Sequence, residues 1–175
     1  MKVNTTRSRA KKAMRRTGQK QYRPEQILAF DIIKNCTLTF GMRKLEMEYQ
    51  PNNLVPLEGT DLTGDRVPTL DIYLQDVNSE HYAIRLNGPY HDELKQERKD
   101  FIQKTFLEMQ PHKWHVIDFN YTTMQHLFKR NQRKLSPGEL LLAYNEVKSI
   151  MQRFGIMLRT PRDEIFNKLA EAHCA

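Results

Sequence analysis

The order of strand and helix patterns is the feature that most limits what this chain can fold into. Apolar and charged residues alternate over residues 43–49, with the two-residue period of a strand that has one buried face. Strand patterns return at residues 69–74, 81–86 and 114–119, and only loops or turns separate the first three strands. A charged helix expected over about residues 92–109 can cross the sheet, so that the fourth strand pairs parallel to the third. The pattern therefore predicts an α/β fold with a mixed sheet.

Helices are expected on both sides of these strands. Pro24 is a favourable first residue of a helix, and apolar residues follow it at helical spacing. After the sheet, residues 122–134 have a helical pattern, and Ser136 and Glu139 have the spacing of a capping box that begins a longer helix. A last helix is expected to begin at Thr160 by the same logic. We expect these C-terminal helices to pack on the sheet or to form a small helical appendage.

The positive charge of the chain is concentrated at its N-terminus. The formal net charge is +7, but residues 1–23 hold nine Lys and Arg residues and no acid, which leaves 19 bases against 21 acids elsewhere. Clustered bases bind phosphates by releasing counterions, so this arm predicts contact with nucleic acid. A solvated tail that aids solubility is the alternative. We divide the chain into a basic arm (residues 1–21), an α/β core (22–121) and a C-terminal helical extension (122–175).

Two basic clusters supply the candidate nucleic-acid-binding residues. The first is the arm, and the second follows the fourth strand, where a solvated helix end is an equally good account. The candidates are Arg7, Arg9, Lys11, Lys12, Arg15, Arg16 and Lys20 in the arm, and Lys129, Arg130, Arg133 and Lys134 in the second cluster.

A series of short motifs resembles the PD-(D/E)xK nuclease superfamily, and most closely its branch of very-short-patch-repair-like endonucleases. The motifs are Asp71-Ile-Tyr-Leu, Ile84-Arg-Leu-Asn-Gly-Pro-Tyr-His91, a helix with Arg98 and Asp100, and the strand at residues 116–119. Their order and spacing agree with the family over about residues 22–120. The resemblance implies a restriction-endonuclease-like mixed sheet flanked by helices, and Glu25 matches an acid often found on the family's first helix.

The resemblance also assigns the candidate site residues, which are Asp71, Arg85, Asn87, Glu25 and His91. Family members carry carboxylates at positions 85 and 87, and these hold Mg²⁺ together with the first aspartate. An arginine stays charged and cannot ligate a cation. We therefore expect Arg85 to occupy the place of the cation and to pair with Asp71, with Asn87 beside them and no metal. Each candidate also has a structural alternative. In that alternative, Asp71 and Arg85 form an ordinary pair between neighbouring strands, and Glu25 is an acid favoured in the first turn of a helix. His91 then caps the next helix or is exposed.

Three functions follow from this pattern. The preferred one is a nucleic-acid-binding protein on a degenerate nuclease-like fold, without standard Mg²⁺-dependent cleavage and without a cofactor. The second is an active metal-dependent endonuclease that holds Mg²⁺ with Asp71 and a displaced acid: Glu25, Asp61 or Asp65. The third is a structural or assembly protein whose C-terminal helices contact a protein partner.

Several other classes find no support in the sequence. Cys36 and Cys174 form no CxxC pair, so we expect neither a disulfide scaffold nor a cysteine-rich zinc module, and we expect a reducing intracellular compartment. His112 and His115 lack a further ligand pair with zinc spacing. We expect a soluble protein, because the N-terminus lacks the apolar segment of a secretory signal and no run approaches the roughly 20 apolar residues of a membrane span.

Overall fold

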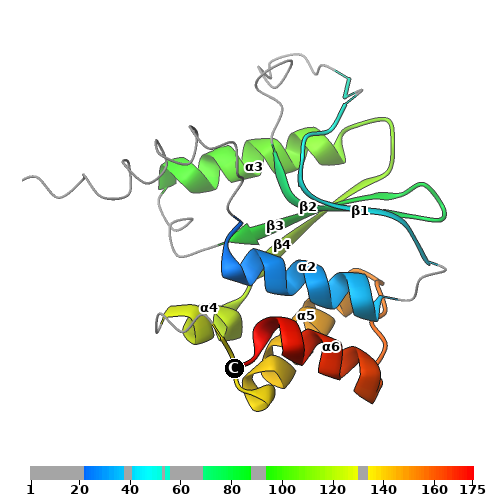
Figure 1. Cartoon of the computed structure of the whole chain (residues 1–175). Helices are drawn as coiled ribbons and strands as arrows, with labels where there is room; N and C mark the ends of the chain where they lie inside the picture. The colour runs from blue at the N-terminus through cyan, green and yellow to red at the C-terminus, as the bar shows by residue number, and fades with distance from the viewer. Residues whose placement is uncertain (1–21, 38–40, 53, 56–68, 88–93, 130–133) are drawn as a thin grey trace, which may run out of the picture.

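The computed structural model describes residues 22–37, 41–52, 54–55, 69–87, 94–129 and 134–175 of the chain. The basic arm, His91, Asp61, Asp65, Arg130 and Arg133 lie outside these residues. The elements are α2 (Pro24–Cys36), β1 (Met42–Tyr49), β2 (Leu70–Asp76), β3 (His81–Asn87), α3 (Leu94–Glu108), β4 (Trp114–Asn120), α4 (Thr122–Lys129), α5 (Pro137–Arg153) and α6 (Asp163–His173) (Figure 1).

The strands form one mixed sheet in the order β1-β2-β3-β4. β1 pairs antiparallel with β2, and β2 pairs antiparallel with β3. β4 pairs parallel with β3, because α3 carries the chain back across the sheet between them. The predicted α/β class, mixed sheet and parallel fourth strand are confirmed.

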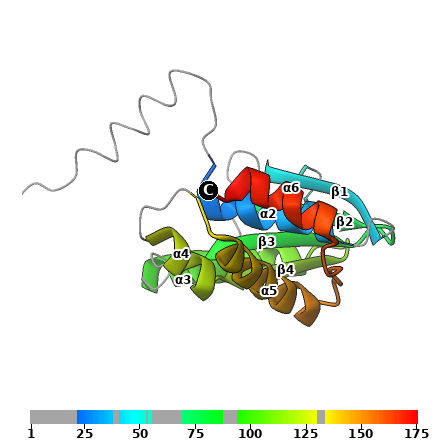
Figure 2. The same ribbon diagram turned by 60° about the horizontal axis from the view of Figure 1, so that its bottom comes forward.

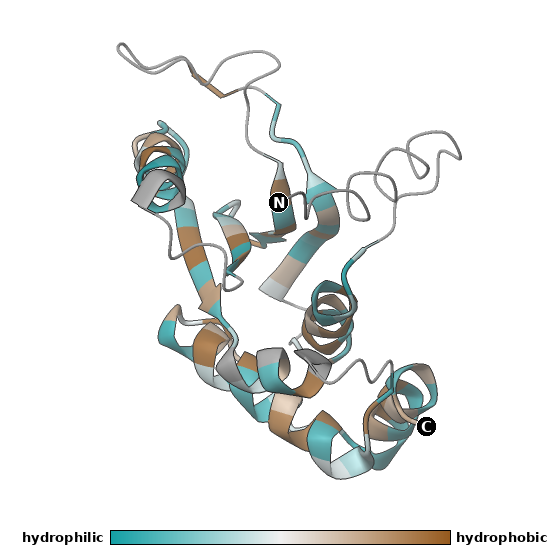
Figure 3. Cartoon of the chain, turned by 90° about the vertical axis from the view of Figure 1, so that its left-hand side faces the viewer, coloured by the Kyte–Doolittle hydropathy of each residue, from teal (hydrophilic) through white to brown (hydrophobic). Residues whose placement is uncertain are grey.

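Helices cover both faces of the sheet. α3 lies on one face, and α2 lies on the other, with α4, α5 and α6 beyond it (Figure 1). Successive strand residues belong to two cores in turn: Ile72 and Ile84 pack on the α2 side, whereas Tyr73 and Ala83 pack with Phe106 of α3. This alternation appears as bands of hydrophobic and hydrophilic residues along the strands in Figure 3.

The C-terminal helices share the larger core with the sheet. Met124, Leu140, Val147 and Leu169 are buried in the same cluster as Ile84. α6 lies alongside α2 (Figure 2), and a 2.7 Å contact joins His173 Nε2 of α6 to Asp31 Oδ2 of α2. These helices therefore pack onto α2 as one continuous core rather than as a detached appendage.

Local signals explain where α5 and α6 begin. The capping box of α5 is confirmed, since Ser136 Oγ accepts from Glu139 N–H and the Glu139 carboxylate accepts from Ser136 N–H at 2.7 Å. The expected start at Thr160 is wrong: α6 begins at Asp163, after Arg162, which makes no side-chain cap. Acidic residues in the first turn, Asp163 among them, favour this start through the helix dipole.

None of the helices among the described residues is long and apolar enough to cross a membrane.

Candidate functional site

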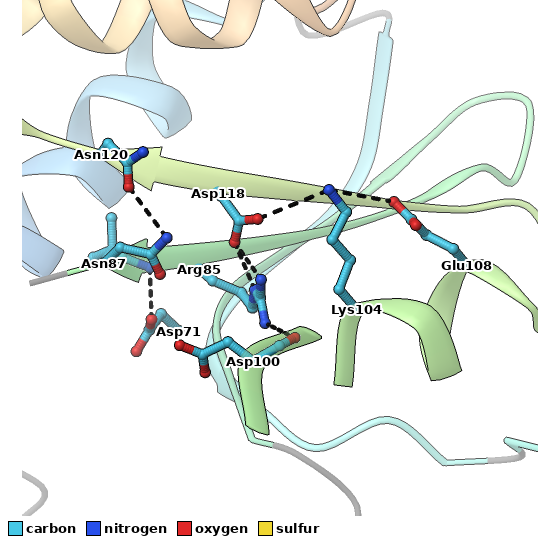
Figure 4. Close-up of polar contacts among 9 residues, drawn as sticks. Asp71, Arg85, Asn87, Asp100, Lys104, Glu108, Asp118 and Asn120 are labelled. Carbon is cyan, nitrogen blue, oxygen red and sulfur yellow. Dashed lines mark hydrogen bonds and ion pairs between the residues drawn. The ribbon is translucent and has the colours of Figure 1, made fainter. Parts of the chain in front are cut away.

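The site predicted from the sequence lies where β2 begins and where β3 and β4 end, under α3 (Figure 4). In the parallel register of β3 and β4, Arg85 lies opposite Asp118 and Asn87 lies opposite Asn120. Directly paired residues project to the same face of a sheet, and residues two apart on one strand do so as well. The four side chains therefore gather on one face, as the two-residue alternation of positions 85 and 87 predicts.

Arg85 is the centre of this cluster. Its Nε donates to Asp118 Oδ1 at 2.8 Å, and its Nη2 contacts the same oxygen. Its Nη1 donates to the backbone carbonyl of Asp100 on α3, also at 2.8 Å. The Arg85 side chain is 12% exposed and that of Asp118 is 30% exposed. A mostly buried guanidinium thus ties β3 to both β4 and α3, while Lys104 Nζ lies 4.0 Å from the other Asp118 oxygen.

The expected ion pair between Arg85 and Asp71 is wrong, because Arg85 pairs with Asp118 instead. The parallel register places Asp118 directly opposite Arg85. The Asp71 carboxylate accepts the backbone N–H of Leu86 at 2.7 Å and lies 3.6 Å from Arg23 Nη2. Asp71 thus takes up a backbone donor of β3 next to Arg85, at the point where β2 begins.

The second position of the nuclease-like motif carries an amide pair. Asn87 Nδ2 donates to Asn120 Oδ1 at 3.2 Å. Asn87 Oδ1 is buried and has no hydrogen-bond partner within the described residues. A buried acceptor without a partner costs free energy, so a ligand that donates a hydrogen bond to Asn87 Oδ1 would relieve this cost.

The start of α2 closes the same end of the sheet. Tyr121 donates its hydroxyl to Glu25 Oε1 at 3.3 Å, and burial raises the pKa of Tyr121 to about 12, so that the hydroxyl stays protonated. Gln26 is 2% exposed and donates to the Asp71 carbonyl at 3.0 Å and to Glu48 Oε1 at 3.1 Å. Sequence analysis missed Gln26, since a polar residue in a helix gives no signal that it is buried.

The described acids of the site are already engaged by protein donors. Asp118 accepts from Arg85, and Asp71 accepts from Leu86 N–H. Among the residues that the structure describes, no group of three or more His, Cys, Asp or Glu side chains is placed to hold a metal ion. The predicted His91, and the loop acids Asp61 and Asp65, are outside the described ranges.

A polar groove begins beside Asn120 and runs between α4 and α5. Its volume is about 400 Å³. Its lining combines the polar side chains of Thr123, Asn145, Ser149 and Arg153 with the Glu146 carboxylate and the apolar Leu142 and Ile150. The hydroxyl, amide and guanidinium groups donate hydrogen bonds to oxygen acceptors such as those of phosphates and sugars. Asn120 thus borders both the site and this groove.

Two of the eleven basic candidates, Lys129 and Lys134, lie among the described residues. The structure places Lys134 in an exposed position, whereas Lys129 is placed only as the last residue of α4. The other nine candidates lie outside the described residues, seven of them in the arm. Arg23, the basic residue that directly precedes α2, is described, and its Nη2 lies 3.6 Å from Asp71 Oδ1.

Comparison with known proteins adds no further assignment. No protein-family model matches this sequence, and neither the curated proteins nor the solved structures give a match. The resemblance to PD-(D/E)xK nucleases thus remains an interpretation of the sequence motifs.

Proposed function

We propose that this protein binds nucleic acid at the end of its sheet, on a restriction-endonuclease-like fold whose metal site is replaced by an internal ion pair. One observation carries the proposal: the guanidinium of Arg85 lies between the Asp118 carboxylate and the Asp100 carbonyl. In the nuclease-like motif, position 85 is that of a carboxylate that holds Mg²⁺. A fixed positive charge there repels a divalent cation and engages the acid that could have bound it.

The basic groups around the site support binding to a polyanion. Arg23 stands at the root of an arm that carries eight further bases, and it lies 3.6 Å from Asp71. Arg98 and Lys99 are exposed on α3, the helix that holds Arg85 through its backbone. Basic side chains of this kind bind phosphate groups without recognising the nucleotide sequence, and their contribution to affinity falls as the salt concentration rises.

Binding assays with labelled oligonucleotides test this proposal. The full chain is titrated into single-stranded DNA, duplex DNA and single-stranded RNA, each of the same length, at low and at physiological salt, with fluorescence anisotropy as the readout. We expect binding to at least one of them that weakens steeply with salt. A chain that binds none of them at low salt contradicts the proposal.

A cleavage assay separates binding from catalysis. Plasmid DNA is incubated with the protein and Mg²⁺ or Mn²⁺, and we expect no nicking above that of a matched blank. Cleavage that is abolished by Asp71→Ala would instead establish the metal-dependent endonuclease, with Asp71 acting beside a displaced acid such as Glu25, Asp61 or Asp65.

A protein-contact platform is the second candidate function, and exposed apolar residues on and after α5 favour it. Leu141 and Leu142 in its first turns are 48% and 54% exposed, and Met157 beyond its end is 52% exposed. Met151, by contrast, is fully buried in the core. A stoichiometric protein partner that copurifies without nucleic acid, and is lost in the Leu141→Ser and Leu142→Ser double variant, would favour this function.

A further inference from the structure

The most exposed large hydrophobic side chain among the described residues is Phe101 of α3. It is 68% exposed. α3 holds the sheet through other residues, since Phe106 and Leu107 are 1% exposed and belong to the core on this face. Phe101 is therefore not needed to attach α3 to the sheet, and its ring faces solvent.

Basic residues flank Phe101 along the helix. Residues three apart are neighbours on a helix surface, which places Arg98 and Lys104 one turn before and one turn after Phe101. Arg98 is exposed and Lys104 is half-buried, with Nζ lying 4.0 Å from oxygens of Asp118 and Glu108. Glu97 is also exposed on the turn before Phe101 and opposes this charge. Lys99 is exposed beside Arg98, so residues 97–100 carry two basic side chains and two acidic ones, Glu97 and Asp100.

Phe101 lies next to the interface proposed above. It directly follows Asp100, whose carbonyl accepts from Arg85. Figure 4 shows the Lys104 side chain reaching from α3 to Asp118 of β4, while the Asp100 carboxylate points toward Asp71 of β2. A nucleic-acid strand held by the basic side chains of Arg98 and Lys104 would pass Phe101, because Phe101 lies between them on α3.

We propose that Phe101 stacks on an unpaired base of a single-stranded nucleic acid, an inference that rests on the proposed function. An aromatic ring between basic side chains suits this ligand, because bases stack on the ring while the cations hold the phosphates. The ring projects from the outer surface of a helix, where it meets the face of a base only if that base is unstacked. Every base has such a face, so the contact favours single strands without selecting a sequence.

Three variants of the full chain test the proposal. Phe101→Ala removes the ring, Phe101→Trp keeps an aromatic ring, and Met109→Ala is the matched control. Met109 is 63% exposed and directly follows the end of α3 at Glu108, about two helical turns beyond Phe101. Each variant is titrated into a labelled oligothymidylate and into a duplex of the same length, and its melting temperature is compared with that of the wild type.

We expect Phe101→Ala to weaken oligothymidylate binding by about tenfold or more, the effect of losing one base stack. Phe101→Trp should restore the affinity, and its added tryptophan fluorescence should be quenched by the oligonucleotide. The natural Trp114 is 8% exposed, so the wild type should show little quenching. Met109→Ala should stay within about twofold of the wild type, because its side chain makes no base stack.

Four results would overturn the inference, and each excludes a different part of it. If the wild type binds oligothymidylate and Phe101→Ala binds as well as Met109→Ala, only the stacking role is wrong. Equal losses for duplex and single strand exclude selection of unpaired bases. A dimer in light scattering that Phe101→Ala dissociates would show that a second copy covers this ring. If the wild type binds no nucleic acid at all, the proposed function fails together with the inference.

Discussion

Removal of the Arg85 guanidinium is the most direct test of the site's architecture. Arg85→Ala breaks the ion pair with Asp118 and the hydrogen bond to the Asp100 carbonyl in one step. Those two contacts join β3 to β4 and to α3. The variant should therefore have a lower free energy of unfolding, because β3 is held less firmly against β4 and α3.

The expected loss in the free energy of unfolding depends on how deeply the Arg85–Asp118 ion pair is buried. Breaking a buried ion pair from one side costs about 3–5 kcal/mol, and breaking an exposed pair costs about 0–1 kcal/mol. Arg85 at 12% exposure and Asp118 at 30% lie between these limits. Lys104, 4.0 Å from Asp118, still offsets part of the charge left behind. We expect a loss of about 2–3 kcal/mol, which lowers the melting temperature of a domain of this size by roughly 4–12 °C.

Chemical denaturation of the wild type and variants measures this loss. Arg43→Ala is the control, because Arg43 is an exposed strand arginine whose Nη1 lies 3.2 Å from Ser79 Oγ, and its removal should cost at most about 0.5 kcal/mol. The Arg85→Ala and Asp118→Ala double variant should lose less than the two single variants together, because the second change removes the orphaned charge. An Arg85→Ala loss no larger than that of Arg43→Ala would refute the reasoning.

Three further predictions concern the arm, a buried amide and a half-buried histidine. Deletion of residues 1–20 removes eight of the nine bases of residues 1–23, so nucleic-acid binding should weaken and its salt dependence should flatten in anisotropy titrations, while the melting temperature is retained. Gln26→Ala should cost about 1–3 kcal/mol in urea denaturation, because it leaves the Asp71 carbonyl and Glu48 without their donor. Burial lowers the pKa of His81 below its ordinary 6.5, so the unfolded chain binds the proton more readily and stability falls as the pH drops below about 6.5. His81→Phe should reduce that fall in melting temperature between pH 7.5 and 5.5, and an unchanged pH profile would exclude His81 as its source.

The element order followed from the sequence because its signals are local. Strand alternation, turn residues and the capping box at Ser136 each act over a few residues, and a helix placed between two strands makes a parallel crossover the natural connection. These signals also placed Arg85 and Asn87 on one face, since that depends only on the period of a strand.

The partner of Arg85 did not follow from the sequence because the register of a parallel pair is not local. Whether position 85 lies opposite 116, 118 or 120 depends on the length of the crossover and on how α3 packs. The motif resemblance predicted Asp71 as the ion-pair partner of Arg85, although Asp118 is the one acid of the fourth strand pattern. Gln26 was missed for a related reason, because its burial depends on β1 and β2, which are distant in the sequence.

A double substitution that introduces carboxylates at positions 85 and 87 tests whether the site has the geometry of a metal site. Arg85→Glu with Asn87→Asp places two new carboxylates on the face that already carries Asp118, beside Asp71. Like charges at short range destabilise the folded state, so the double variant without metal should melt below the wild type.

A divalent cation should relieve that repulsion. Binding to the folded state alone raises stability with ligand concentration, so Mn²⁺ or Mg²⁺ should raise the melting temperature of the double variant and leave that of the wild type unchanged. Arg43→Glu, which repeats the charge change of Arg85→Glu at an exposed position of β1, is the control and should not respond to metal. Calorimetry that detects no metal binding to a folded double variant would show that these carboxylates do not converge. The resemblance to a nuclease site would then be one of sequence pattern only, and Arg85 would be a structural arginine with no cation to replace.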